Sequence, residues 1–331
     1  MITDGDPTEM LKRVSREILP LYGMEAASVD PIADSNELVL RVVGKDDQQY
    51  VLRLQDPEDM PDSAVRTQLD WLNSILDETH IVVPRPVALK SGQPFGAITV
   101  ANRPRPFRFV LLGWLEGQRK STPSEWVEHD NLVLIGKVVA RLHENSKQHD
   151  VPQDCGVPVL NAAAFLGESC ALRRNEAKRY LGGVDLERFY RHMDVVRAAL
   201  VECVEREEER GLIHADLGPH NWLFFGGVPS IIDFDAFAVG YFVHDLLGVL
   251  WSHSHWDGNE EYVKSLFAGY ETVRCIADNV KANVFSLQAA HCLMWINWVL
   301  SMKNGRMRDE LVRHIPHQVQ IVEKLCGKGN A

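Results

Sequence analysis

The chain has 331 residues, of which 45% are hydrophobic and 24% are charged, and this composition excludes disordered, collagen-like and disulfide-scaffold proteins. Lys and Arg number 35 against 46 Asp and Glu, and the resulting formal charge of −11 argues against non-specific binding to nucleic acid or to an anionic membrane. The six cysteines form no C-x-x-C pair and no zinc-type spacing, and the acidic start lacks an apolar run. We therefore expect reduced thiols and a cytoplasmic protein.

The first third of the chain is predicted to form strands and one helix. Two runs rich in branched apolar residues, 37–43 and 49–54, flank a short polar loop that is typical of a hairpin. Apolar residues at helical spacing predict a helix over 62–77. Three further extended segments follow: 82–87, 96–101 and 108–114. Together they predict a five-stranded sheet with one helix inserted after the third strand.

From about residue 117 the pattern changes to helices. The predicted helices are 124–146, 185–209, 239–253, 258–275 and 279–302. A short strand-rich insert, 211–235, lies among them. The pattern thus divides the chain into a small β-rich lobe at 1–112, a connection at 113–117 and a helical lobe at 118–331.

The insert contains the residues that suggest chemistry. A polar loop, 214–221, precedes two short strands joined by a Gly-Gly turn, and the second strand leads into Asp233 and Asp235. Two paired strands would present Asp216, Asn221 and Asp233 on one side. Three oxygen-bearing side chains that converge in this way suit a hard cation such as Mg²⁺, which shares its coordination with water and phosphates.

This spacing resembles the catalytic and metal loops of the protein-kinase-like fold, H-R-D-x-x-x-x-N and D-F-G. His214-Ala215-Asp216 with Asn221 corresponds to the first, and Asp233-Phe234-Asp235 to the second with Asp in place of Gly. That replacement and the surrounding string resemble the phosphotransferase enzyme family, which includes aminoglycoside phosphotransferases, choline kinases and type II homoserine kinases. The resemblance covers residues 30–255. It implies an α+β, two-lobed fold: an N-terminal five-stranded antiparallel sheet plus helix binds the nucleotide, 113–117 is the hinge, and the C-terminal lobe is mostly helical.

The resemblance also implies roles for single residues of the insert. Asp216 would be the catalytic base, and Asn221 and Asp233 would hold the metal. His214 would brace the loop, and Asp245 would tie a helix to the loop backbone. Asp235 is open between reaching a second metal and hydrogen-bonding the loop.

The small lobe carries the residues implied to bind ATP: Arg53 in place of a kinase Lys, Ser35 and Asn36 in place of a glycine-rich loop, and Leu112 and Trp114 in the hinge. A guanidinium can bind phosphate through two nitrogens, so Arg53 preserves the chemistry; the alternative is an exposed strand arginine. Gln68 departs from the family, which usually has Glu there to pair with the strand cation.

We therefore expect an ATP- and Mg²⁺-dependent kinase that transfers the γ-phosphoryl group to a hydroxyl of a small molecule of the homoserine, choline or aminoglycoside class. Neither nucleic acid nor a membrane is an expected partner. Two alternatives stay open. One is a Ser/Thr protein kinase of the stress-response type. The other, motivated by Gln68 and the missing glycines, is a nucleotide-binding protein that has lost its activity.

Overall fold

The computed structural model describes residues 13–32, 38–58, 60–99, 105–120, 123–152, 154–161, 166, 171–173, 178–181, 186–204, 209–250, 260–302 and 305–328. The chain divides into two compact units. The first contains 1–117 together with 149–157 and 230–232, and the second contains 118–148, 158–229 and 233–331. The lobes 1–112 and 118–331 and the hinge 113–117 are predictions from the sequence and are separate from this division into units.

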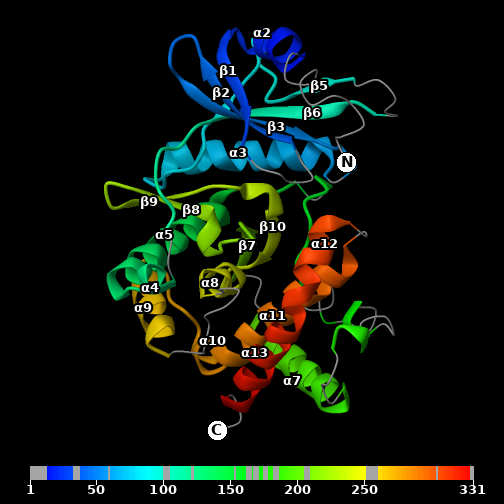
Figure 1. Ribbon diagram of the computed structural model, residues 1–331. Coiled ribbons are helices and arrows are strands. Elements are labelled where there is room, and N and C mark those ends of the chain that lie inside the picture. Colours follow the sequence, from blue (N-terminus) through cyan, green and yellow to red (C-terminus); the bar gives the residue numbers. More distant parts are fainter. Residues whose placement is uncertain are drawn as a thin grey trace. The chain divides into compact units, whose positions relative to one another are not determined.

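The first unit is built on an antiparallel sheet (Figure 1). Its elements are η1 (Val14–Ile18), α2 (Leu19–Tyr22), β1 (Ala26–Pro31), β2 (Leu38–Gly44), β3 (Gln49–Gln55), α3 (Asp62–Glu78), β4 (Pro86–Val87), β5 (Gly96–Ile98) and β6 (Phe107–Gly113). The strand order is β1-β2-β3-β6-β4, with β5 paired to β6. The sheet has six strands where the sequence predicts five, because β1 was not predicted. The helix α3 follows β3, at the place where the sequence predicts a helix over 62–77.

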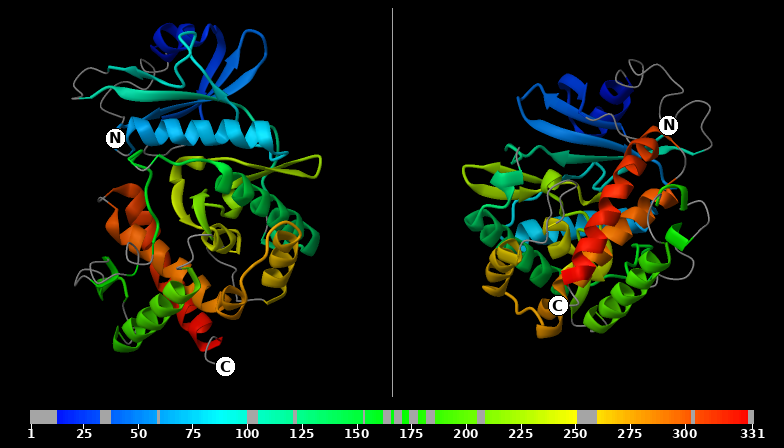
Figure 2. Two further views of the ribbon diagram at one scale, coloured as in Figure 1. Left: turned by 180° about the vertical axis from the view of Figure 1, so that it is seen from behind. Right: turned by 60° about the horizontal axis from the view of Figure 1, so that its bottom comes forward.

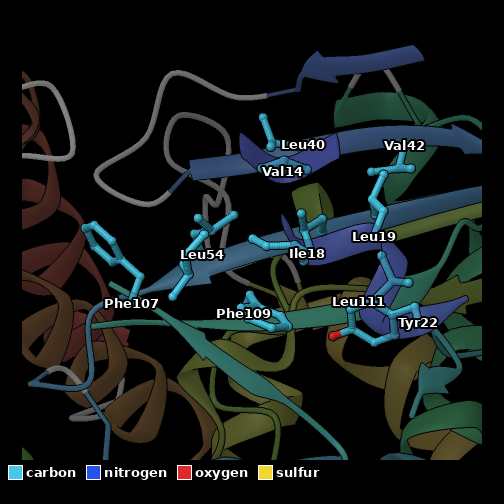
Figure 3. Packing of buried hydrophobic residues seen from close by; sticks show 12 residues of the cluster. Val14, Ile18, Leu19, Tyr22, Leu40, Val42, Leu54, Phe107, Phe109 and Leu111 are labelled. Atoms are coloured by element: carbon cyan, nitrogen blue, oxygen red, sulfur yellow. The ribbon is translucent and has the colours of Figure 1, made fainter. Parts of the chain in front are cut away.

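One face of this sheet is covered by an apolar core (Figure 3). Side chains alternate between the two faces of a strand, so Leu52 and Leu54 of β3 share a face and are fully buried. Leu40, Leu52 and Leu111 are directly opposite one another on neighbouring strands. Ile18 and Leu19 pack over them, which explains why this short helical segment stays attached to the sheet.

The second unit is mostly helical (Figure 1). Its helices are α4 (Pro123–Trp126), α5 (His129–Gln148), α7 (Leu186–Val204), α8 (Val243–Leu250), α9 (Glu260–Glu271), α10 (Asp278–Ala282), α11 (Val284–Ser301), α12 (Arg306–Leu311) and α13 (Ile315–Lys328). Four short turns of other helical types add to them: η2 (Ala171–Arg173), η5 (Pro219–Asn221), η6 (Phe234–Ala236) and η7 (Val312–His314). Four short strands complete the described elements: β7 (Arg210–Ile213), β8 (Trp222–Phe225), β9 (Val228–Ile231), whose last two residues are assigned to the first unit, and β10 (Ala238–Tyr241). Strand β8 pairs with β9, and β7 with β10.

The predicted helix 239–253 is wrong at its start. Residues 238–241 form β10, which pairs antiparallel with β7, and the helix α8 begins only at Val243. Gly240 explains the strand, because a Cβ there would lie 2.4 Å from Cδ1 of Ile213 on β7. The predicted helices 124–146 and 279–302 are each interrupted once, and α12 and α13 were not predicted.

Close helix crossings in the second unit depend on glycine. A Cβ on Gly136 of α5 would lie 2.1 Å from the carbonyl oxygen of Leu266, and one on Gly269 of α9 would lie 1.9 Å from that of Val133. The helix α11 packs along α13 and α7 (Figure 2). None of the helices in the described part of the chain combines the length and apolarity that a membrane span requires.

Candidate active site

Asp216 lies in the loop after β7, and its carboxylate is held from two sides. Nε2 of His220 lies 3.1 Å from its Oδ2, and Nδ2 of Asn221 donates to the same oxygen at 2.9 Å and to the Asp216 backbone carbonyl at 2.8 Å. Burial raises the pKa of Asp216, but the hydrogen bond and charge of His220 and the charge of His214 outweigh it, so the pKa is lowered. The side chain is 44% exposed. Asp216 is therefore an ionised carboxylate that faces solvent in a fixed orientation.

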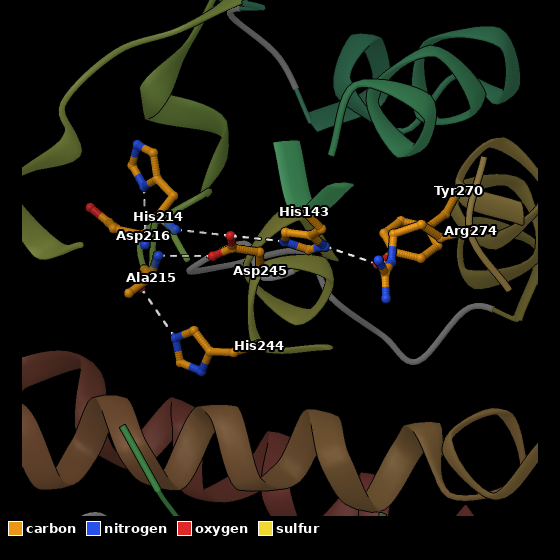
Figure 4. Close-up of polar contacts among 8 residues, drawn as sticks. All are labelled: His143, His214, Ala215, Asp216, His244, Asp245, Tyr270 and Arg274. Carbon is orange, nitrogen blue, oxygen red and sulfur yellow. Dashed lines mark hydrogen bonds and ion pairs between the residues drawn. The ribbon is translucent and has the colours of Figure 1, made fainter. Parts of the chain in front are cut away.

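The backbone before Asp216 is held in a left-handed conformation by Asp245. Ala215 has a φ of 65°, a region that costs a residue with a Cβ about 1–3 kcal/mol. The Asp245 carboxylate accepts the backbone N–H of His214 at 2.9 Å and that of Ala215 at 2.8 Å. Nε2 of His244 lies 3.2 Å from the Ala215 carbonyl oxygen (Figure 4). The backbone of the loop is thus held through two N–H groups and through the carbonyl oxygen of Ala215.

Asp245 is fully buried and has a further partner in α5. Nε2 of His143 lies 3.2 Å from its Oδ2, and Nδ1 of the same ring lies 2.9 Å from the hydroxyl of Tyr270. Burial lowers the pKa of His143 in spite of the Asp245 charge. Burial raises the pKa of Asp245, but the His143 hydrogen bond and the neighbouring histidine charges lower it by more. We therefore assign a neutral imidazole that donates to an ionised carboxylate.

The polar contacts continue from Tyr270 to the surface of the second unit (Figure 4). Nε of Arg274 donates to the Tyr270 hydroxyl at 3.1 Å, and its terminal nitrogens bind Glu144 and, at 3.2 Å, Glu209. A chain of polar groups thus extends from partly exposed glutamates to the backbone beside Asp216.

Asp233, His214 and Phe234 lie at the other side of the loop. Asp233 has a left-handed backbone, with a φ of 65°, directly before η6. Its charge raises the pKa of Asp216, so the two carboxylates are within electrostatic reach. The fully buried His214 ring lies 4.6 Å from the Phe234 ring and accepts the N–H of Asp216 at 3.2 Å. Asp235 is half-buried within η6.

The donors for a metal ion in this unit are few. In the described residues, no group of three or more His, Cys, Asp or Glu is arranged to hold a metal. Mg²⁺ is commonly bound through one or two carboxylates while water and phosphate oxygens supply the rest. Asn221 uses its amide nitrogen for Asp216, and its amide oxygen is the atom that a metal would take. The donor types of Asn221 and Asp233 therefore fit the expected ion.

In the first unit, Arg53 lies on the face of the sheet opposite the apolar core. It is directly opposite Val110 on β6, and Arg108, two residues earlier on the same face, donates to Asp62 of α3 at 3.0 Å through Nε. Arg53 therefore faces the side covered by α3, the helix that carries the buried Gln68.

The expected hinge residues have their backbone N–H groups engaged within the first unit. Gly113 donates to the Arg85 carbonyl at 2.8 Å and Trp114 to the Gln49 carbonyl at 3.0 Å. The Trp114 ring lies 5.0 Å from the guanidinium of Arg41. An adenine contact at Leu112 or Trp114 must therefore use atoms other than these N–H groups. Ser35 and Asn36 lie outside the described residues.

The sequence is similar to known phosphotransferases. A profile described as "Phosphotransferase enzyme family" matches residues 29–278. The chain belongs to this family. Amicoumacin kinase of Bacillus subtilis (strain 168) is 23% identical over 244 residues, which are 72% of this chain and 68% of that protein. Homoserine kinase of Gluconacetobacter diazotrophicus is 28% identical over 260 residues, which are 74% of this chain and 71% of that protein.

Solved structures of the same fold agree. The microcompartment-associated aminopropanol kinase has a TM-score of 0.76 at 22% identity, covering 98% of this chain and 97% of that one. Amicoumacin kinase in complex with AMP-PNP, Ca²⁺ and Ami has a TM-score of 0.71 at 17% identity, covering 96% of this chain and 93% of that one. The predicted family and two-lobed fold are confirmed. As a phosphotransferase-family member, the protein is a small-molecule kinase that acts on a hydroxyl group. The predicted cofactors, ATP and a divalent metal ion, are typical of this family, and the amicoumacin kinase structure contains AMP-PNP and Ca²⁺.

Sequence reasoning missed three histidines of this phosphotransferase site: His143, His220 and His244. His143 had a signal, because it follows Leu142 on the predicted helix 124–146 and is a polar residue at the edge of its apolar stripe. His220 and His244 are neighbours of Asn221 and Asp245. His220 lies in the polar segment 214–221, to which no helical or strand period assigns a direction, and His244 lies near the start of α8, where the predicted helix 239–253 is wrong, so only the coordinates show their contacts.

Proposed function

We propose that this phosphotransferase transfers the γ-phosphoryl group of ATP to the hydroxyl of a small amino alcohol. The relatives are named for aminopropanol, homoserine and amicoumacin, and the first two are small molecules that carry both a hydroxyl and an amine. The acidity of the chain, with a formal charge of −11, suits a cationic acceptor.

The observation that carries the proposal is the state of Asp216. A general base must be deprotonated, reachable and oriented. The lowered pKa of Asp216 keeps the carboxylate deprotonated, and its 44% exposure makes it reachable. The hydrogen bond from Asn221 orients it. Asp216 accepts the hydroxyl proton of the acceptor as its oxygen attacks phosphorus, and positions that oxygen in line with the leaving group.

The supporting residues have separate roles in this proposal. The Asn221 amide oxygen and the Asp233 carboxylate hold Mg²⁺, which neutralises phosphate charge when it is bound. His214 and Asp245 keep the loop backbone in place. Arg53 binds phosphate oxygens through its guanidinium, while Asp235 stays open between a metal and the loop.

A panel assay tests this function. Purified protein, ATP and Mg²⁺ are incubated with single amino alcohols, with choline, with an aminoglycoside and with simple alcohols, and ADP release is measured. We expect ADP release with amino alcohols that is lost in Asp216→Asn. Labelled phosphate that appears on protein instead would favour the protein-kinase alternative. A rise in melting temperature with ATP but without turnover would favour a nucleotide-binding protein that has lost its activity.

A further inference from the structure

A small cavity of about 20 Å³ lies in the second unit between α7, α8 and α11. Its lining is mainly apolar and includes the buried Leu200, Leu247, Ala290 and Met294. A cavity of this size has room for one water molecule, which is also about the size of one methyl group. Because most of the lining is apolar, the cavity suits a methyl or methylene group better than a water molecule.

The lining also includes polar residues, which we call the rim of the cavity. The rim includes the half-buried His244 and His291 and the exposed Asn161. The two imidazole rings lie 5.1 Å apart, His244 on α8 and His291 on α11. A ligand can therefore enter with an apolar end inside and a polar end at the rim.

The rim also connects the cavity to Asp216. Nε2 of His244 lies 3.2 Å from the carbonyl oxygen of Ala215, the residue before Asp216, and Figure 4 shows this contact. The Asp216 charge also acts on His291. His244 thus links the lining of the cavity to the backbone of the residue before the proposed base, within the same unit.

The rim carries no positive charge near neutral pH. Burial lowers the pKa of His244, and it lowers the pKa of His291 to about 3, with the His244 charge adding to the effect. The charged groups that face the two rings are the carboxylates of Asp216 and Asp245. An acceptor that carries an ammonium group is therefore attracted at the rim.

We infer that this cavity is a specificity pocket of the acceptor site: it takes a single methyl-sized branch of an amino alcohol whose hydroxyl faces Asp216, and His244 and His291 form its rim. The inference rests on the proposed function and adds a size limit to it. One methylene more or less in an apolar pocket changes kcat/KM by about 10–200-fold. The pocket should therefore select acceptors by one carbon.

Three primary alcohols of equal hydroxyl chemistry test the inference: ethanolamine, 2-amino-1-propanol and 2-amino-1-butanol. In the wild type we expect kcat/KM for 2-amino-1-propanol to exceed that for each of the others by on the order of tenfold. Met294→Ala enlarges the pocket and should raise the ratio of 2-amino-1-butanol to 2-amino-1-propanol by on the order of tenfold. Met294→Val, a smaller truncation, serves if the alanine variant does not fold, and should shift the ratio in the same direction.

Met193→Ala is the matched control, because Met193 of α7 is also buried but does not line the cavity. It should lower the melting temperature and leave the acceptor ratios within twofold of the wild type. Turnover with ratios that are alike in wild type, Met294 variants and Met193→Ala would overturn the pocket and leave the proposed function intact. A wild type that turns over none of the three amino alcohols would overturn the proposed substrate class, and the pocket assignment with it.

Discussion

The sheet of the first unit and the catalytic loop of the second are stabilised by different kinds of contact. Leu40, Leu52 and Leu111 are apolar, fully buried and opposite one another across three strands. The loop is instead held by buried polar groups, above all Asp245 and His143, each with named partners. Apolar packing is non-directional and tolerates swaps of similar volume. A buried hydrogen-bonded charge tolerates little change even of similar shape. Mutations in the sheet should therefore change the free energy of unfolding and leave kcat unchanged, whereas mutations in the loop should lower kcat.

The largest expected effect separates chemistry from stability at the loop. Asp216→Asn removes the proposed base and should lower kcat by about 10²–10⁴-fold. Its melting temperature should stay close to that of the wild type, because the side chain is 44% exposed. Steady-state kinetics and thermal unfolding on one preparation check both. Asp194→Asn, at an exposed position of α7, is the matched control and should change neither. A wild-type kcat in Asp216→Asn would contradict the assignment of the base.

The next effect concerns the buried charge of the loop. Asp245→Asn presents an amide where the N–H groups of His214 and Ala215 need acceptors, and leaving a buried donor unsatisfied costs about 1–3 kcal/mol. Denaturant unfolding should show this loss, and kcat should fall as well, because the strained Ala215 backbone loses its anchor. A variant with lowered stability but unchanged kcat would show that Asp245 supports the fold without positioning Asp216.

In the sheet, a mutation should change the free energy of unfolding but not kcat. Leu52→Ala leaves a cavity in the core and should cost about 3 kcal/mol of unfolding free energy. At temperatures where the variant is folded, its kcat should match the wild type. Leu52→Met, of similar volume, should cost less than about 1.5 kcal/mol. Equal losses in the two variants would mean that this core is not close-packed, against the zero exposure of Leu40, Leu52 and Leu111.

A smaller effect depends on pH. Because His291 has a pKa of about 3 in the folded protein against an ordinary value of 6.5, the unfolded chain binds this proton first as the pH falls. Acid therefore favours unfolding, and the stability due to neutral His291 is lost as the pH falls below about 6.5. Between pH 7 and pH 5 the wild type should lose about 1–2 kcal/mol more than His291→Asn. Parallel pH profiles of unfolding free energy for the two proteins would contradict the neutral rim.

The same contrast explains what could be predicted from the sequence. Strands β2, β3 and β6 and the helix α3 have apolar periods that repeat, so their places followed from the pattern alone. The strand β1 has a burial pattern without clean alternation, and it was missed. In the loop, H-x-D-x-x-x-x-N identified Asp216 and Asn221 by resemblance.

The contacts around the loop could not be predicted in this way. The partners of Asp245 come from residues 102 and 31 positions away, His143 and His214. A period describes one element and carries no information about which distant element it meets. The cavity beside His244 likewise depends on how three helices pack, so it becomes visible only in the coordinates.

The smallest expected effect tests the departure at Gln68. This residue is 5% exposed on α3, the helix that covers the sheet face bearing Arg53. If Gln68 orients Arg53 as the family's usual Glu would, Gln68→Glu gives the Arg53 guanidinium a carboxylate partner, which it can bind as an ion pair, in place of a neutral amide. The KM for ATP should then fall by about threefold, as measured by initial rates at saturating acceptor. Gln318→Glu, the same change at a fully buried position of α13, should lower stability and leave this KM unchanged. If Gln68→Glu lowers stability in the same way and also leaves the KM unchanged, then Gln68 is a residue of the helix packing alone, and Arg53 is oriented by other groups of the first unit.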